Sequence, residues 1–220
     1  MKTYLNLKEV SERCRANGWG YSSDGEPLPF TEYQFKKIAE LLGNVESNPS
    51  YRSLFEELAR WIHETLRPRR SLELGCGPGY LVYCMNRLGI DALGVDGNSF
   101  FWRDFQLVHY DIRDRYILDP LFELPTQSAD LFASIEVFEH IPDDGLHHVM
   151  RRVRDDLRSR FIVFSSTPYK SEEPDWDLQW GHINLKQPDD WAKFFSDYGY
   201  KLLSDKPPVT EWAQLYERVK

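Results

Sequence analysis

The chain has 220 residues, of which 41% are hydrophobic, and its formal net charge is −8. This length is enough for one substantial core and does not call for several independent domains. The negative charge and the pI near 5.3 argue against a protein that grips nucleic acid mainly through its phosphates, although a small or terminal nucleic-acid substrate stays open. We expect a single domain, with residues 51–220 as its core and residues 1–50 as an extension that could form a lid.

Cysteine usage and hydropathy indicate a cytoplasmic compartment. The three cysteines, Cys14, Cys76 and Cys84, are odd in number and scattered, which favours neither a disulfide framework nor a zinc module. The first residues lack an apolar run of signal-peptide length, and no apolar run approaches the roughly 20 residues that span a bilayer. We therefore expect a soluble, cytoplasmic protein that does not bind membranes.

Helix and strand patterns alternate along the chain. Residues 51–67 carry apolar side chains at helical spacing and are followed by Pro68, which ends the helix. Further helices are expected at 80–89, 144–157 and 189–200, and strands at 71–75, 91–97, 105–111, 129–136, 160–167, 201–205 and 212–219. Such alternation predicts an α/β fold with a doubly wound, mostly parallel seven-stranded sheet. The last two strands, joined by a short Pro-rich turn at 206–211, should form an antiparallel hairpin.

The stretch SLELGCGPGY, residues 71–80, places glycines at 75, 77 and 79 directly after a predicted strand. A glycine turn at the end of a strand and the start of a helix is where α/β folds hold nucleotide-like ligands. The dinucleotide fingerprint G-x-G-x-x-G requires a third glycine at position 80, where this chain has Tyr80. A dinucleotide-dependent oxidoreductase is therefore disfavoured.

Three carboxylates accompany the turn. Asp96 ends the next predicted strand, where it can accept hydrogen bonds from both hydroxyls of a ribose. Asp111 ends the third predicted strand, where it can accept from an adenine amine while Ile112 packs on the ring. Glu73 lies inside an apolar strand, and a nearby cationic ligand would compensate such a buried carboxylate.

Together with the run ADLFASIEVFEHI, these motifs resemble the class I S-adenosylmethionine-dependent methyltransferases over about residues 50–220. The resemblance implies a Rossmann-like methyltransferase fold with a terminal hairpin and S-adenosylmethionine as the cofactor. The cofactor-binding residues that it implies are Glu73, Gly75, Cys76, Gly77, Gly79, Tyr80, Asp96, Gly97, Asp111, Ile112 and Glu136.

The run IEVFEHIP, residues 135–142, places Glu136, Glu139 and His140 on one face of a single turn. His182, after the fifth predicted strand, can reach the same end of the sheet. Two glutamates and two histidines could bind a divalent metal such as magnesium, which would acidify a hydroxyl acceptor. The run also resembles the metal-assisted ubiquinone-pathway and small-RNA 2′-O-methyltransferases. Alternatively, His140 or His182 acts as a general base without a metal, or the histidine only shapes the cofactor pocket.

The acceptor is suggested by the aromatic and acidic segment 168–182, which could cover the site from one side, with 18–33 on the other. Its pattern resembles methyltransferases of polysaccharide and secondary-metabolite pathways. We expect O-methylation of a small polar metabolite or sugar. The alternatives are 2′-O-methylation of RNA 3′ ends, which the acidic balance disfavours, and a non-catalytic S-adenosylmethionine binder that regulates a partner.

Overall fold

The computed structural model describes residue 36 and residues 48–97, 116–118, 124–125, 127–170, 177 and 180–219. The helices are α3 (Pro49–Trp61), α4 (Tyr80–Arg87), α6 (Asp143–Arg152) and α8 (Pro188–Ser196), with shorter helical turns η2 (Ile62–Leu66), η4 (Phe138–His140) and η5 (Val153–Leu157). The strands are β1 (Arg70–Leu74), β2 (Asp91–Asp96), β3 (Tyr116–Leu118), β4 (Leu131–Ile135), β5 (Phe161–Ser165), β6 (Tyr200–Leu202) and β7 (Gln214–Arg218).

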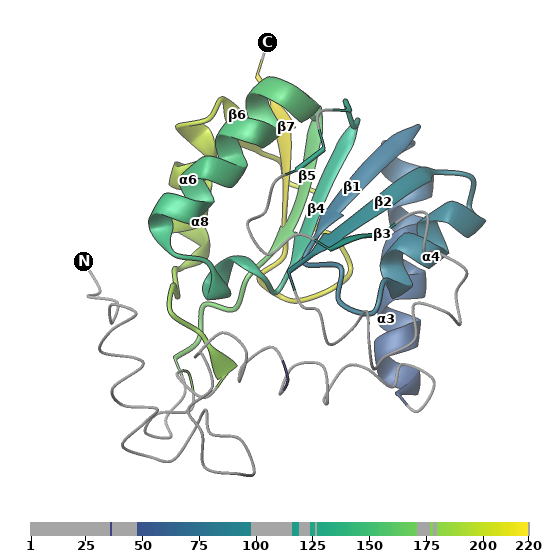
Figure 1. The fold of residues 1–220 in the computed structure, drawn as a ribbon, viewed down its shortest axis with the longest axis horizontal. Helices are drawn as coiled ribbons and strands as arrows, with labels where there is room; N and C mark the ends of the chain where they lie inside the picture. The colour runs from purple at the N-terminus through teal and green to yellow at the C-terminus, as the bar shows by residue number, and fades with distance from the viewer. Residues whose placement is uncertain are drawn as a thin grey trace.

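These strands form one seven-stranded sheet in the order β3-β2-β1-β4-β5-β7-β6. Neighbouring strands are parallel except for β7, which runs antiparallel to both β5 and β6. Figure 1 shows α3 and α4 beside the β1–β3 half of the sheet and α6 and α8 beside the β5–β6 half. The predicted doubly wound, mostly parallel sheet with an antiparallel last strand is thus confirmed.

Local sequence explains where the helices begin and end. The Asn48 side chain accepts a hydrogen bond from the backbone N–H of Tyr51, and Pro49 occupies the first turn of α3, where its missing N–H is not needed. At the other end Arg67 adopts a left-handed φ of 49°, directly before Pro68. α4 begins after Gly79 and is followed by Gly89, both with positive φ. The chain therefore turns into β1 and β2 at the predicted breakers.

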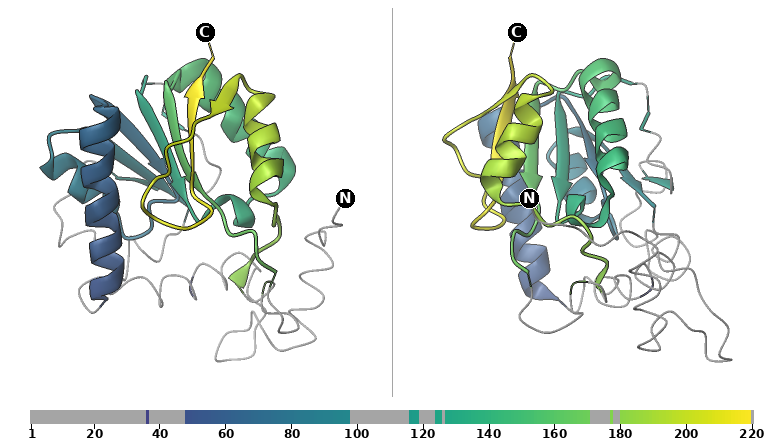
Figure 2. Two further views of the ribbon diagram at one scale, coloured as in Figure 1. Left: turned by 180° about the vertical axis from the view of Figure 1, so that it is seen from behind. Right: turned by 90° about the vertical axis from the view of Figure 1, so that its left-hand side faces the viewer.

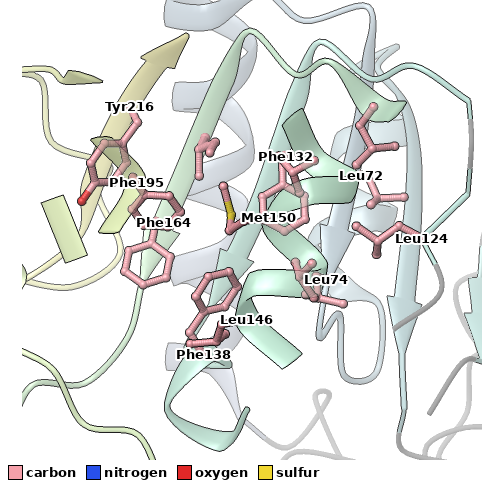
Figure 3. Close-up of a cluster of buried hydrophobic side chains, with 14 of the residues drawn as sticks. Leu72, Leu74, Leu124, Phe132, Phe138, Leu146, Met150, Phe164, Phe195 and Tyr216 are labelled. Carbon is pink, nitrogen blue, oxygen red and sulfur yellow. The ribbon is translucent and has the colours of Figure 1, made fainter. Parts of the chain in front are cut away.

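Two apolar cores cover the two faces of the sheet, and the right-hand view of Figure 2 shows the sheet between helices. β4 and β5 are buried along their whole length, as expected of central parallel strands. In the second core, drawn in Figure 3, the Phe138 ring lies 5.1 Å from the Phe164 ring and 6.0 Å from the Phe195 ring. Phe138 thereby anchors η4, the turn that follows β4, to the core.

Two details differ from the prediction. The strand expected at 105–111 lies outside the described residues, and the strand that pairs with β2 is β3, at Tyr116–Leu118. The connection between β6 and β7 runs over residues 203–213 and is longer than the short turn expected. Within this connection the N–H groups of Val209 and Ala213 donate to the carbonyls of Pro207 and Thr210, and the paired part of β7 starts at Gln214.

Candidate functional site

The glycine turn after β1 has backbone conformations that residues with a side chain rarely adopt. Gly75, Gly77 and Gly79 have φ values of 71°, 53° and 80°, in the left-handed region that side chains disfavour. A Cβ atom on Gly75 would lie 2.2 Å from Cγ2 of Val137, so the turn also packs tightly against the residue that follows Glu136. The turn that leaves β1 and the turn that leaves β4 are therefore direct neighbours.

Asp96 ends β2 and is joined to this turn. Its Oδ2 accepts a hydrogen bond of 2.8 Å from the backbone N–H of Gly77, and Asp96 is only 7% exposed. The N–H groups of Gly75 and Cys76 donate to the carbonyl of Val95 at 2.7 and 3.2 Å. These bonds fix the turn against the end of β2.

Glu73 is buried in the middle of β1. It is 3% exposed, and its Oε2 has no hydrogen-bond partner among the described residues. Burial, and to a lesser degree the charge of Asp96, raises the pKa of Glu73 from 4.5 to about 8. A carboxylate in such surroundings is stabilised by a cationic neighbour, so this orphaned oxygen fits a ligand that carries a positive charge.

Two further predicted cofactor residues pack around the turn. The Tyr80 ring is buried, and its hydroxyl donates to Oε1 of Glu56 at 2.5 Å and accepts from Nε of Arg52 at 3.3 Å, both on α3. Cys76 is buried, and its Sγ would lie 2.6 Å from a Cβ placed on Gly94. Both side chains support the turn from the α3–α4 side.

Glu136 follows β4 directly and has a left-handed φ of 55°, which is uncommon for a residue with a side chain. Its Oε1 accepts hydrogen bonds from Oγ of Ser165 and, at 2.9 Å, from Nε1 of Trp212. Burial raises the pKa of Glu136, while these two donors act in the opposite direction. Strained backbone of this kind persists where surrounding contacts hold it, and it concentrates at functional sites.

Glu139, His140 and His182 form a compact cluster in which one possible metal-ligand atom from each lies within 4.8 Å of the others. Glu139 is 1% exposed, and Oγ of Ser166 donates to its Oε2 at 2.9 Å. Burial, together with the charge of Glu136, raises the pKa of Glu139 well above 4.5. The ring centroids of His140 and His182 are 5.1 Å apart.

Burial favours the uncharged form of both histidine side chains. Burial, and secondly His182, lowers the pKa of His140 to about 3, and burial also lowers the pKa of His182. Nδ1 of His140 lies 3.2 Å from the carbonyl oxygen of Gly181. A carbonyl can only accept, so Nδ1 carries the proton in this bond and Nε2 keeps its lone pair.

Backbone hydrogen bonds bring His182 to this place, although it is far from His140 in the sequence. The N–H groups of Ile183 and Asn184 donate to the carbonyl of Glu139 at 2.8 and 2.9 Å. The Asn184 side chain donates to the carbonyl of Ile141 at 2.9 Å. The segment after β5 is therefore clamped onto the turn that follows β4.

Comparison with known proteins identifies the family of the chain. A model of the family described as "Methyltransferase domain" matches residues 50–205. The chain belongs to the class I S-adenosylmethionine-dependent methyltransferases. The turn, Asp96 and the β4 end thus lie in a methyltransferase domain.

Individual relatives cover less of this methyltransferase. The "tRNA U34 carboxymethyltransferase" of Pseudomonas fluorescens (strain SBW25) is 35% identical over 91 residues, which are 40% of this chain and 27% of that protein. The "Ubiquinone biosynthesis O-methyltransferase" of Bordetella avium (strain 197N) is 33% identical over 91 residues, 38% of each chain. The matched part thus spans well under half of either relative. The solved structure of the mitomycin 7-O-methyltransferase MmcR has a TM-score of 0.61 at 15% identity, covers 98% of this chain and 69% of its own, and shows the same fold.

The structure of the methyltransferase brings three of the four predicted metal ligands together and places the fourth outside the cluster. Glu139, His140 and His182 come together, whereas the Glu136 carboxylate is not part of that cluster and is held by Ser165 and Trp212. Gly97 directly follows β2 and is half-buried. Asp111, Ile112 and the stretch 18–33 lie outside the described residues, as does most of 171–179, so their roles stay predictions.

Several residues around the methyltransferase site were not predicted. Ser165 and Ser166 hold the two glutamates, and Trp212 reaches Glu136 from the β6–β7 connection. The adjacent serines at the end of an otherwise apolar strand were a usable signal, because polar residues there face the ligand edge of the sheet. Nothing in the sequence around Trp212 indicates that its indole N–H donates to Glu136. Within the described part of the chain, no helix is both long and apolar enough to cross a membrane.

Proposed function

We propose that this methyltransferase transfers the methyl group of S-adenosylmethionine to a hydroxyl of a small polar metabolite, such as a sugar. The observation that carries the proposal is the cluster of Glu139, His140 and His182 beside the cofactor turn. Methyl transfer breaks the bond between sulfur and the methyl carbon, forms a bond between that carbon and the acceptor oxygen, and requires the hydroxyl proton to leave. Neutral imidazoles beside a buried carboxylate are suited to the last task.

The described residues fit the cofactor in chemical kind. The positive φ of Gly75 and Gly77 shapes the turn that we expect to approach the methionine part, and Asp96 offers a carboxylate to ribose hydroxyls. The unpartnered Oε2 of Glu73 fits a cationic neighbour. S-adenosylmethionine supplies an activated methyl group when bound, so the protein has mainly to align the acceptor and exclude water.

The cluster also fits a divalent metal. One carboxylate and two imidazoles are a donor set typical of Mn²⁺, Fe²⁺, Co²⁺ or Zn²⁺, whereas Mg²⁺ prefers oxygen ligands throughout. Glu139, His140 and His182 would hold the ion, and a bound ion would lower the pKa of an acceptor hydroxyl. Without an ion, His140 or His182 would take the hydroxyl proton directly.

An aromatic corner beside Glu136 supports a ring-shaped acceptor. The rings of Tyr169 and Trp212 meet edge to face at 5.3 Å, and Tyr169 is 58% exposed. The Tyr169 hydroxyl donates to Oε1 of Glu211 at 2.8 Å. An exposed aromatic face next to carboxylates suits the apolar face and the hydroxyls of a sugar or a phenol.

Calorimetric titration with S-adenosylhomocysteine tests the cofactor part. We expect binding to the wild type, at least about a tenfold loss with Asp96→Ala, and no loss with Asp91→Asn at the opposite end of β2. Absence of binding at millimolar ligand, or an unchanged affinity of Asp96→Ala, would contradict the cofactor assignment.

Transfer of labelled methyl groups from S-adenosylmethionine onto pools of hydroxylated metabolites tests the acceptor. We expect labelled product that requires His182 and falls in Tyr169→Ala. Labelling in excess chelator distinguishes the two proton routes. Full activity in chelator would exclude the metal route and leave His140 or His182 as the general base. Label that appears only in amines or thiols would refute the hydroxyl class.

A second candidate is an RNA acceptor, favoured by the similarity to a tRNA U34 carboxymethyltransferase. The net charge of −8 weighs against an extended phosphate contact. Including small RNAs in the same labelling experiment separates the two candidates.

A further inference from the structure

We infer that Asp177 is a positioning residue for His182, and that it fixes which ring nitrogen of His182 faces the reaction. The inference rests on the proposed function, in which His182 binds a metal or accepts a proton. Asp177 belongs to the aromatic and acidic segment 168–182, and its carboxylate contacts a histidine at the end of the same segment.

Asp177 contacts His182 twice. Its Oδ1 lies 3.2 Å from Nδ1 of His182, and its backbone carbonyl accepts a hydrogen bond of 2.7 Å from the His182 N–H. The side chains are 14% and 19% exposed, so the contact is shielded from solvent on most sides. Gly181, with a left-handed φ of 77°, allows the chain to turn back between the two residues.

The contact determines the tautomer of the ring. A carboxylate accepts hydrogen bonds, so the proton of a neutral His182 lies on Nδ1 and the lone pair on Nε2. The bond holds Nδ1 toward Asp177, so Nε2, on the other side of the ring, is directed away from this carboxylate. Nε2 is then the atom that His182 offers to the cluster with Glu139 and His140.

This role is the same whether or not a metal is bound. A histidine that ligates a metal commonly donates its other N–H to a carboxylate, which orients the ring and increases its basicity. A histidine that acts as a general base requires the same tautomer, with the lone pair toward the substrate. Asp177 therefore supports both proton routes of the proposed function.

Nitrogen-15 NMR of the imidazole rings tests the tautomer directly in the full chain. In the wild type we expect the His182 spectrum to show a proton on Nδ1. In Asp177→Asn the amide can donate as well as accept, so a substantial fraction should shift to the Nε2–H form. Asp205→Asn, a change at an exposed acid in the β6–β7 connection, should leave the His182 spectrum unchanged.

Binding of Mn²⁺ alone, followed by electron paramagnetic resonance, gives a second readout. We expect Asp177→Asn to weaken Mn²⁺ binding about 10- to 100-fold, and Asp177→Glu to recover part of the loss. The affinity for S-adenosylhomocysteine and the urea midpoint should stay close to the wild-type values, which distinguishes positioning from general unfolding.

The outcomes separate the inference from the proposed function. If the wild type binds no Mn²⁺ but its His182 tautomer depends on Asp177, the metal route fails and the role of Asp177 stands. If the wild type carries its proton on Nε2, or if Asp177→Asn changes neither tautomer nor Mn²⁺ affinity, the inference is overturned. Should Asp177→Asn not fold, the inference is still tested by the His182 tautomer of the wild type and by the tautomer and Mn²⁺ affinity of Asp177→Glu.

Discussion

Replacing Glu73 with Gln should stabilise the ligand-free protein at neutral to alkaline pH. Burial raises the pKa of Glu73 to about 8, so the folded protein keeps a proton that the unfolded chain releases above about pH 4.5. The free energy of unfolding therefore falls as pH rises between these two values. At about 1.4 kcal/mol per pH unit, the interval from pH 6 to pH 8 lowers the wild-type value by roughly 2–3 kcal/mol. Gln is neutral throughout and avoids this loss.

Urea unfolding of wild type and Glu73→Gln at pH 6, 7, 8 and 9 measures the effect. The difference in free energy of unfolding between the two proteins should widen by roughly 2–3 kcal/mol from pH 6 to pH 8 and then level off. This change corresponds to about 5–10 °C in melting temperature. Glu57→Gln, at an exposed position on α3, should follow the wild type at every pH. Parallel curves for wild type and Glu73→Gln would refute the account of Glu73 as a buried, unpaired carboxyl.

Three further substitutions probe the framework of the site. Gly75→Ala should lower S-adenosylhomocysteine affinity by at least about tenfold, because the new Cβ meets Val137. Adding Val137→Ala should restore only part of the affinity, since the positive φ at position 75 remains. Equal calorimetric affinities in the wild type, Gly75→Ala and the double variant would contradict this. Phe138→Ala should reduce the free energy of unfolding by about 3–5 kcal/mol in urea, with Phe138→Leu less affected; a change under about 1 kcal/mol would contradict the anchoring role of this ring. Trp212→Phe should lower the free energy of unfolding by about 1–3 kcal/mol, because the half-buried Glu136 carboxylate loses a donor. Denaturation curves that coincide with the wild type would show that the bond contributes nothing.

The fold was predictable because its signals are local. Apolar runs such as 131–135 and 161–165 are buried along their length, and breakers such as Pro68 and Gly89 lie where helices end. The start of β7 was less predictable, because pairing there depends on which N–H groups can reach β5 and not on apolar pattern alone.

The site was predictable from short motifs and from strand order, which also placed Asp96 and His182 at the same end of the sheet. The glycine turn and the pair Glu139–His140 are short motifs, and their neighbourhood follows from the pairing of β1 with β4. The bond from Trp212 to Glu136 joins residues 76 positions apart, and the contact of His140 with Gly181 joins residues 41 apart. Such partners are chosen by the packing of the β6–β7 connection and of the segment after β5, which no local pattern encodes.

Ser165 and Ser166 set a limit on how this chain can vary in length. Consecutive residues at the end of a strand point in opposite directions, and here the first bonds to Glu136 and the second to Glu139. Inserting or deleting one residue before this pair would exchange the two directions, and both acids would lose their serine donors in one step. Changes of length within β5 should therefore be rejected, and a designer who wishes to graft a different acceptor loop has to keep the register of both serines.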